Sequence, residues 1–404
     1  MRIGVLTPEL PPKVGGVGTS VIRICKSLQE LGHEVVLISA LHEGGGELLP
    51  RVVELESSQL GLPIMSIGGM AAKGASIRED LKGQLRRVFI ETAIEYLEAK
   101  NLDLFMTFTV GEHSFMGSCI ASGLGIPHIA NARGTDVGGV MFTPKGLHYI
   151  EHTLKRSSAT VFVCSYLKEL TETVFGKRDN FHLILNSCPQ PPSEIYNNRE
   201  RHRRSVREMH GLAPDDFVIG FCGTFREKKG CRFLGEAFRS VVERDKSVKL
   251  LIVGGARTHA EQKLAPHLFD GGLSKTNVRF AGMASERNFV YAQYCAMDVL
   301  VKPSIEDGLP NVILEAMSMG VPVIGTDVFK DVVAHEKTGF ICKRYKVEEL
   351  ADLILFVKDN PELAARVVAA AKDNLQKNHA TLTEAEKYIQ LFRGAISQKE
   401  PALA

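Results

Sequence analysis

Short apolar runs alternate with amphipathic stretches along the whole chain of 404 residues. The short runs have the length of buried strands, and the amphipathic stretches repeat apolar positions at helical spacing. This alternation predicts an α/β fold in which parallel sheets are covered by helices. The expected strands are 2–7, 34–40, 103–108, 127–132, 159–164, 181–186, 217–222, 248–254, 277–281, 298–301 and 322–325. The expected helices are 18–31, 77–99, 113–122, 144–157, 165–175, 230–243, 286–295, 310–319, 347–357, 361–376 and 381–396. Residues 41–76, rich in Gly and Ser, are expected to form loops with short strands.

The pattern breaks once, around residues 187–200. The stretch Ser187–Ser193 contains several prolines, which lack an amide hydrogen and cannot continue a helix or a central strand. We therefore place a linker there and expect two domains, 1–190 and 200–378, each large enough to bury its own core. Residues 379–404 are expected to form a final helix with a short polar tail.

Composition narrows the class of protein. Hydrophobic residues make up 44% and charged residues 24%, an ordinary globular balance, and the net charge of +2 gives no reason to expect a nucleic-acid partner. The N-terminus begins with a strand rather than a signal peptide, and no apolar run is long enough to span a membrane. The eight cysteines form no Cys-x-x-Cys pair, so neither a zinc site nor a disulfide framework is indicated. These features predict a cytoplasmic protein, and attachment to the inner face of a membrane stays open.

One cluster of charge has two interpretations. Arginines surround His202, and they could contact acidic lipid headgroups or an anionic acceptor. We favour a solvated first helix of the second domain, partly balanced by Glu200 and Glu208. The arginines are Arg199, Arg201, Arg203, Arg204 and Arg207.

The most informative stretch is Pro303–Met317, because it places two carboxylates around a tight turn. Asp307 lies at the mouth of the turn and Glu315 lies within the helix that follows. A turn that leads into a helix N-terminus presents free backbone N–H groups and a positive dipole end to an anion. The amides around Gly308, Leu309 and Asn311 can hold phosphate while the carboxylates accept hydrogen bonds from sugar hydroxyls. The stretch therefore predicts a binding site for a nucleotide-sugar.

Two further loops follow expected strands where parallel sheets bind ligands. Gly15 and Gly16 precede the first helix, but Val21 stands at the last position of a Gly-x-Gly-x-x-Gly fingerprint, which argues against a nicotinamide enzyme. After strand 217–222 come Gly223 and a basic loop ending in Lys229. Cations at the carboxyl end of a parallel strand suit a diphosphate, although a solvated basic turn has the same composition.

The sequence contains no Asp-x-Asp pair of the kind that holds a metal ion on a diphosphate. We therefore expect Lys229, Arg226 and the amides after Asp307 to stabilise the leaving group without a metal or other cofactor. The nucleotide-sugar would be a co-substrate.

Pro303–Met317 also resembles the signature of the retaining glycosyltransferases with the GT-B fold, glycosyltransferase family four. In that family two acidic residues flank seven others, and Ala-Met, Gly and Pro-Val follow, as they do here after Glu315. Asp307 stands where the family more often has Glu, and Glu306 is one residue too far from Glu315 to replace it. The resemblance implies two facing Rossmann-like domains with a cleft between them. It assigns acceptor binding to the first domain and donor binding to the second, and it implies a final helix that crosses back to the first.

The resemblance also implies roles for residues of the second domain. Glu315 is expected to hold the nucleotide ribose, Asp307 the donor sugar and Lys229 the diphosphate. Thr224 stands where the family has an Arg, so Arg226 is the candidate to replace that phosphate contact. Gly282 is expected where the nucleobase approaches the backbone.

In the first domain the resemblance implies a further group of cleft residues. Gly16 is expected near the donor phosphates and Gly15 on the acceptor side. His113 matches a histidine that contacts the transferred sugar and phosphate. Arg133 and Asp136 match a His-Gly-x-Asp segment, with Arg in place of His, on the acceptor side.

The implied function is transfer of a hexosyl group from a nucleoside diphosphate-sugar to an acceptor hydroxyl with retention of configuration. The acceptor could be a glycan, a lipid-linked sugar or a small metabolite, in glycan, glycolipid or glycoconjugate biosynthesis. Two other hypotheses stay open. The departures at Thr224 and Asp307 keep open a catalytically silent sugar-nucleotide-binding or scaffold protein. A sugar-nucleotide epimerase would need acid/base carboxylates and histidines in the first domain.

Overall fold

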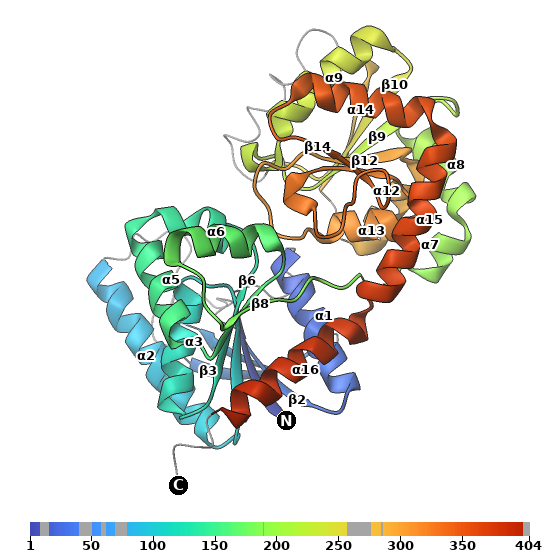
Figure 1. Cartoon of the computed structure of the whole chain (residues 1–404). Helices are drawn as coiled ribbons and strands as arrows, with labels where there is room; N and C mark the ends of the chain where they lie inside the picture. Colours follow the sequence, from blue (N-terminus) through green and yellow to red (C-terminus); the bar gives the residue numbers. More distant parts are fainter. Residues whose placement is uncertain are drawn as a thin grey trace. The chain divides into compact units, whose positions relative to one another are not determined.

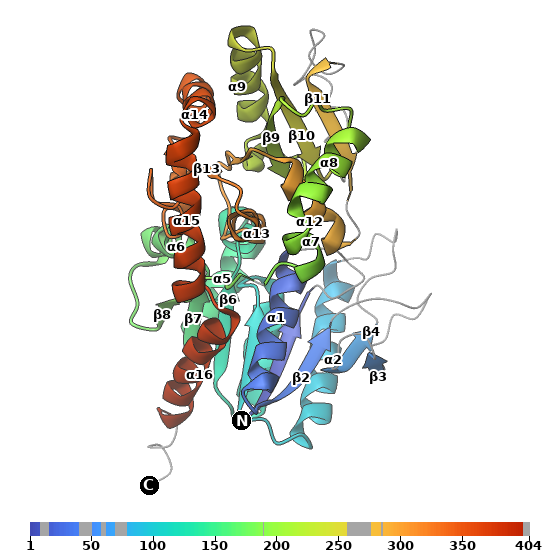
Figure 2. The same cartoon turned by 90° about the vertical axis from the view of Figure 1, so that its right-hand side faces the viewer.

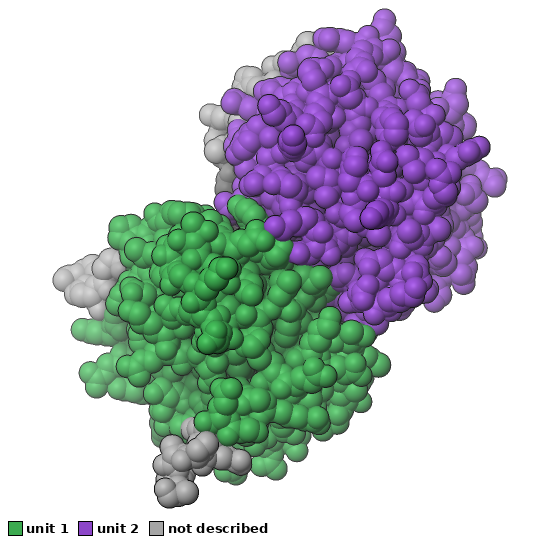
Figure 3. Space-filling view, viewed as in Figure 1, with its two compact units in different colours: residues 1–186, 381–404 green, residues 187–380 purple. Residues whose placement is uncertain are grey.

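The chain forms two compact units, coloured green and purple in Figure 3. Unit 1 comprises Met1–Asn186 and Thr381–Ala404, and unit 2 comprises Ser187–Ala380. The computed structural model describes residues 1–8, 16–39, 51–57, 62–68, 79–188, 190–256, 276–283 and 286–398. The chain passes from one unit to the other after Asn186, next to the proline-rich stretch, and returns after Ala380.

Unit 1 contains an eight-stranded sheet in the order β3-β4-β2-β1-β5-β6-β7-β8. The strands are β1 (Arg2–Thr7), β2 (Glu34–Ser39), β3 (Arg51–Ser57), β4 (Leu62–Gly68), β5 (Leu104–Phe108), β6 (His128–Ala132), β7 (Ala159–Phe162) and β8 (Phe181–Leu183). Most neighbours are parallel, but β3 and β4 are antiparallel. Both strands lie within residues 41–76, for which loops with short strands were expected. The stretch between Ser57 and Leu62 is much shorter than the dozen or so residues that a parallel crossover needs.

Helices cover both faces of this sheet. They are α1 (Gly16–Glu30), α2 (Glu79–Glu98), α3 (Glu112–Gly123), α4 (Thr135–Gly138), η1 (Val140–Phe142), α5 (Pro144–Arg156), α6 (Ser165–Phe175) and α16 (Thr381–Ser397). Successive side chains of a strand point to opposite faces, so Ile3 and Val5 of β1 pack with α1 and α16 while Leu6 packs with α2 and α3. Figure 2 shows α1 and α2 on either side of the strands.

The C-terminal helix α16 packs on unit 1. Its side chains Ala385, Tyr388 and Phe392 are fully buried and share a core with β1 and α1. Figure 1 shows the two helices, at opposite ends of the sequence, lying beside one another. The last helix of the chain therefore completes the core that the first strand begins.

Unit 2 contains a six-stranded parallel sheet in the order β11-β10-β9-β12-β13-β14. The strands are β9 (Phe217–Cys222), β10 (Val248–Val253), β11 (Val278–Gly282), β12 (Val299–Lys302), β13 (Val323–Thr326) and β14 (Phe340–Cys342). From β9 the chain builds outward through β10 and β11, and it then restarts on the other side of β9 with β12. The loops that follow β9 and β12 therefore diverge, which is where open α/β sheets bind their ligands.

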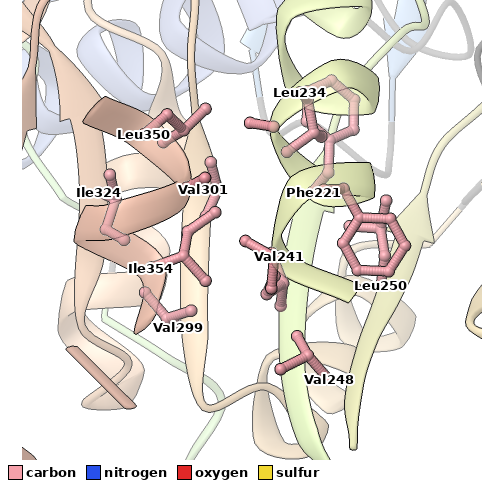
Figure 4. Close-up of a cluster of buried hydrophobic side chains, with 14 of the residues drawn as sticks. Phe221, Leu234, Val241, Val248, Leu250, Val299, Val301, Ile324, Leu350 and Ile354 are labelled. Atoms are coloured by element: carbon pink, nitrogen blue, oxygen red, sulfur yellow. The ribbon is translucent and has the colours of Figure 1, made fainter. Parts of the chain in front are cut away.

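The helices of unit 2 bury an apolar core against this sheet. They are α7 (Ser193–Asn197), α8 (Arg199–Met209), η2 (Glu227–Lys229), α9 (Cys231–Arg244), α12 (Arg287–Ala296), α13 (Asn311–Met319), η3 (Asp327–Phe329), α14 (Val347–Asp359) and α15 (Pro361–Asn378). Leu234 and Val241 of α9 and Leu350 and Ile354 of α14 meet strand side chains such as Val301 (Figure 4).

Two of the five clustered arginines have structural partners. Arg203 and Arg207 donate hydrogen bonds to the two carboxylate oxygens of Asp298, at 2.6 and 2.7 Å, and thereby hold α8 against α12. Arg207 is 3% exposed, whereas Arg201 and Arg204 are exposed. The interpretation of a solvated helix therefore fits Arg201 and Arg204 but not Arg207.

All eight cysteines are free thiols. In the described part of the chain, no helix combines the length and the apolar character that crossing a bilayer requires.

Candidate functional site

A buried ion pair joins the loops that follow β9 and β12 in unit 2. Lys229, the last residue of η2, donates a short hydrogen bond to Oδ2 of Asp307, and their side chains are only 17% and 11% exposed. The backbone amide of Gly308 donates to Oδ1 of Asp307 at 3.1 Å. The amide of Ile305 donates to the carbonyl of Lys228 at 2.9 Å, so backbone and side chains both connect the loops.

Gly230 lets the two loops come this close. Its φ of +72° lies in the left-handed region, and a Cβ at this position would lie 1.8 Å from the carbonyl oxygen of Pro303. A larger residue would push the loops apart and move Lys229 away from Asp307. A glycine follows Lys229 because a side chain at position 230 would clash with the backbone of Pro303.

A second lysine lies beneath the pair and was missed by the sequence analysis. Lys302, the last residue of β12, is 1% exposed and donates to the carbonyl of Cys222 at 3.2 Å. Burial, and then the nearby charge of Lys229, lower the pKa of Lys302 to about 8. A lysine that ends an otherwise apolar strand was the signal that could have identified it.

These cations govern the ionisation of Asp307. Burial by itself disfavours the charged carboxylate, but the charges of Lys229 and Lys302 outweigh it and the pKa of Asp307 is lowered. Asp307 is therefore a carboxylate at neutral pH, surrounded by an excess of positive charge. Such a cluster is suited to an anionic ligand.

Glu315 belongs to a separate group, in which the carboxylate is buried and its partner Arg287 is exposed. The Glu315 side chain is 5% exposed; Arg287 donates to Oε1 at 2.5 Å and the Tyr294 hydroxyl donates to Oε2 at 3.0 Å. Burial and the charge of Glu315 raise the pKa of Tyr294. Both partners come from α12, and sequence reasoning assigned a role to neither of them.

The N-terminus of α13 adds donors and one unpaired acceptor. Asn311 is the first residue of the helix and is 9% exposed, and its Oδ1 has no hydrogen-bond partner. Gly308 and Leu309, just before the helix, are buried. A buried amide oxygen without a donor is uncommon in folded proteins, and here it could accept a hydrogen bond from a ligand hydroxyl.

Three glycines end adjacent strands of the same sheet. Gly223, Gly254 and Gly282 follow or end β9, β10 and β11, all with positive φ. The amide of Gly254 donates to the carbonyl of Gly282 at 2.8 Å, and a Cβ on Gly254 would lie 2.0 Å from the carbonyl oxygen of Gly223. This edge thus exposes backbone that a flat ligand can approach closely.

Thr224, which stands where the family has an Arg, and Arg226, the candidate to replace that Arg, lie in the loop after β9. Thr224 is half-buried, and Arg226 directly precedes η2. The carbonyl of Arg226 accepts a hydrogen bond from the amide of Lys229 at 3.0 Å, so its backbone helps to place that lysine.

The candidate residues of unit 1 lie after β5 and β6. Asp136 is 8% exposed and accepts hydrogen bonds from the backbone amides of Val110, Arg133 and Gly134, at 3.0, 3.1 and 2.6 Å, which ties the two loops together. His113 is the second residue of α3, and burial lowers its pKa, so its imidazole is neutral at pH 7.

The remaining candidates of unit 1 lie at the start of α1. Gly16 begins the helix, and a Cβ there would meet nothing within 4 Å. Gly15 lies outside the described residues.

The structure thus brings Lys229, Asp307 and Gly308 together, and it places Glu315 in a neighbouring cluster on α13. It brings Arg133 and Asp136 together in the other unit. Within the ranges that the structure describes, no group of three or more His, Cys, Asp or Glu side chains is arranged to hold a metal ion.

Comparisons with known proteins agree with both halves of the chain. Residues 14–188 match the family described as Glycosyltransferase Family 4, and residues 216–360 match Glycosyl transferases group 1. The capsular polysaccharide biosynthesis glycosyltransferase CapM of Staphylococcus aureus is 33% identical over 36% of this chain and 38% of that protein. The N-acetyl-alpha-D-glucosaminyl L-malate synthase of Bacillus anthracis is 22% identical over 94% of each chain. Anabaena HepE, solved with UDP-glucose, aligns with a TM-score of 0.76 at 16% identity, over 98% of this chain and 100% of that one.

We expect the contribution of the Lys229–Asp307 pair to stability to vanish at low pH. Because folding lowers the pKa of Asp307, the contribution is complete above the unfolded value of about 4 and is lost as the pH falls through the folded value. At pH 7, Asp307→Asn should lower the free energy of unfolding by about 1–3 kcal/mol, because Lys229 is left without its charged partner. Denaturant titrations of both proteins, followed by circular dichroism at pH 7, 5 and 3, measure the difference.

Asp352→Asn is the matched control, because the Arg244–Asp352 pair is 46% and 64% exposed. Exposed pairs contribute less than about 1 kcal/mol, so this variant should change little at any pH. A difference between wild type and Asp307→Asn that stays constant from pH 7 to pH 3 would contradict the assigned charge state.

Proposed function

We propose that unit 2 binds the nucleotide-sugar donor and that unit 1 binds the acceptor. The premise of this proposal is that the chain belongs to glycosyltransferase family 4, the glycosyl transferases group 1. The chain is a retaining glycosyltransferase of the GT-B fold, and it transfers a hexosyl group from a nucleotide-sugar. The observation that supports this division most is the cationic cluster of Lys229 and Lys302 around Asp307, at the point where the strand order of unit 2 reverses.

Each polar group of this cluster suits one part of the donor. Lys229 and the amides at the start of α13 bind the diphosphate. Asp307 accepts hydrogen bonds from hydroxyls of the transferred sugar, and Glu315 does so from the ribose. Arg287 and Tyr294 hold the carboxylate of Glu315 in place. The glycine edge formed by Gly223, Gly254 and Gly282 leaves room for the nucleobase.

The same groups stabilise the departing charge. When the bond between the anomeric carbon and the donor phosphate breaks, negative charge grows on the nucleoside diphosphate. Lys229, with Lys302 behind it, meets that charge with fixed positive charge in a buried site. The acceptor oxygen attacks on the face that the leaving group departs from, and the departing phosphate takes the acceptor proton. Arg226 is the candidate for a second phosphate contact.

We propose that this chemistry needs no metal, because the sequence contains no Asp-x-Asp pair and Lys229 and Lys302 supply positive charge at the site. Uridine diphosphate is the proposed nucleotide, since the similar HepE structure contains UDP-glucose. Lys302 also offers an explanation for Thr224, which stands where the family has an Arg. The positive charge of that Arg can be supplied here by Lys302, at the end of β12. That argues against a catalytically silent protein.

On the acceptor side we propose His113, Arg133 and Asp136, with Gly16 and Gly15 in the loop before α1. A neutral His113 can donate or accept a hydrogen bond without adding charge. The relatives named above act in capsular polysaccharide biosynthesis and in synthesis of a glucosaminyl malate. We propose a comparable role in glycan or glycoconjugate biosynthesis. Free thiols suit the reducing cytoplasm, where we place the enzyme.

One nucleoside diphosphate should stabilise the protein, with or without chelator. A ligand at about a hundred times its dissociation constant stabilises by roughly 2.7 kcal/mol, which is a shift of several degrees. We expect this shift with uridine diphosphate in a thermal-denaturation screen that includes guanosine and adenosine diphosphates. A shift that disappears with chelator would refute the metal-free site, and no shift with any nucleotide would refute the donor site.

Replacing Lys229 should impair turnover more than folding. Lys229→Ala removes a group that meets charge in the transition state, and losing one such donor typically lowers kcat by about a hundred- to a thousandfold. Donor hydrolysis or transfer, measured beside the melting temperature, separates the two effects. Lys337→Ala, at an exposed lysine of unit 2, is the control and should leave kcat unchanged. An unchanged kcat in Lys229→Ala would remove this residue from the mechanism.

A further inference from the structure

Two arginines in unit 1 share one amide oxygen, Oδ1 of Asn186. Arg23 of α1 donates to Glu384 of α16 through Nε and Nη2, at 3.2 and 3.1 Å, and the two side chains are 8% and 2% exposed. Arg133, which follows β6, instead donates through Nη2 to Oδ1 of Asn186 at 2.8 Å. The same Oδ1 lies 3.4 Å from Nη2 of Arg23, so one amide oxygen serves both guanidinium groups.

Each guanidinium group has one nitrogen without a partner. Nη1 of Arg23 and Nη1 of Arg133 are both buried and form no hydrogen bond. A guanidinium group carries five N–H donors in a fixed plane, and native proteins leave few buried donors unpaired. Each residue as a whole is partly exposed, although the two Nη1 atoms themselves are buried.

The other polar groups nearby do not supply the missing acceptor. Both carboxylate oxygens of Asp136 accept backbone amides. The Tyr388 hydroxyl donates to Oδ1 of Asn131 at 2.6 Å and lies close to Arg133. Burial raises the pKa of Tyr388 by more than the nearby Arg133 lowers it, so the hydroxyl is neutral and supplies no negative charge. Among the residues that the structure describes, the carboxylate that accepts side-chain hydrogen bonds from this pair is Glu384, and it accepts them from Arg23.

The position of the two arginines fits a ligand of the acceptor side. Arg133 directly follows β6, and Arg23 lies in the helix that follows β1, so both belong to connections at the carboxyl ends of the strands of unit 1. Parallel sheets bind their ligands at this end. The planar fork of a guanidinium group matches the oxygens of a phosphate or a carboxylate, often with two parallel hydrogen bonds.

We propose that Arg23 and Arg133 together bind an anionic group of the acceptor, a phosphate or a carboxylate, through their unpaired Nη1 atoms. The anion supplies the acceptors that the two guanidinium groups lack. The assignment of the anion to the acceptor rests on the proposed function. The binding of an anion by the two arginines does not depend on it. The malate named in the relative from Bacillus anthracis is a dicarboxylate, which agrees with an acidic acceptor.

The test uses the full chain with inorganic phosphate and, separately, with malonate as the dicarboxylate probe. Thermal denaturation over a concentration series should give a melting temperature that rises with at least one probe, and the responding probe identifies the anion. Arg133→Gln should weaken the apparent affinity by about ten- to a hundredfold, which is the loss expected for hydrogen bonds to a charged group. Arg178→Gln is the matched control and should respond like wild type, because Arg178 lies elsewhere in unit 1 and donates to the carbonyl of Leu154.

A purely structural role for the pair gives a different result. If Arg133 only holds Asn186, Arg133→Gln should melt earlier than wild type in anion-free buffer and keep the response to anions. Our proposal expects a melting temperature in anion-free buffer no lower than that of wild type, because an incompletely paired cation has been removed. Arg133→Lys keeps the charge without the fork and should bind the anion with intermediate affinity. Equal responses of wild type and Arg133→Gln, or no response of wild type to either probe, would overturn the inference.

Two additions separate this site from the donor site. Lys229→Ala should keep the response to phosphate or malonate, since Lys229 lies in unit 2. Uridine diphosphate should stabilise wild type and Arg133→Gln equally. If the nucleotide stabilises both but neither anion does, the inference is wrong and the donor proposal stands. If an anion acts as expected and the nucleotide does not, the donor proposal fails and the anion site stands.

Discussion

The ion pair between Lys229 and Asp307 fixes the geometry of the proposed donor site, because each partner belongs to a different loop at the point where the strand order of unit 2 reverses. Neither charge could be buried alone at an acceptable cost in free energy. Gly230 permits the approach of the loops, and Lys302 biases Asp307 toward its charged form. A nucleoside diphosphate would enter a site whose positive charge is already arranged, so little reorganisation is needed during the reaction.

Glu315 in unit 2 and the arginines Arg23 and Arg133 in unit 1 differ in how completely their polar atoms are hydrogen-bonded. Glu315 has a partner for each oxygen, Arg287 and Tyr294, which leaves it rigid. Arg23 and Arg133 are left with unpaired nitrogens. Complete pairing suits groups that orient a ligand through a fixed geometry, whereas incomplete pairing suits groups that take part of their charge balance from the ligand itself. The proposed donor site and the proposed acceptor site would then differ in how completely their charged groups are paired before the ligand binds.

Much of the fold was readable because its signals are local. Strands such as 2–7 and 217–222 are continuous apolar runs, and their observed bounds agree with the predicted ones. The strand β14 is too short to give a periodic signal, and the antiparallel β3 depends on a short connection rather than on its own pattern. Asp307 and Lys229 could be proposed from the sequence because turn residues mark their positions. Lys302 near this pair and Arg287 beside Glu315 could not, because the register of β12 and the packing of α12 on α13 bring them into place.

Hydrogen exchange read by mass spectrometry, with and without uridine diphosphate, tests the central claim most directly, because it locates the ligand independently of turnover. The account predicts slower exchange in two segments of unit 2, residues 223–230 and 304–315, whose amides surround Lys229, Asp307 and Glu315. Unchanged exchange in both segments under saturating nucleotide, or protection confined to unit 1, would contradict it.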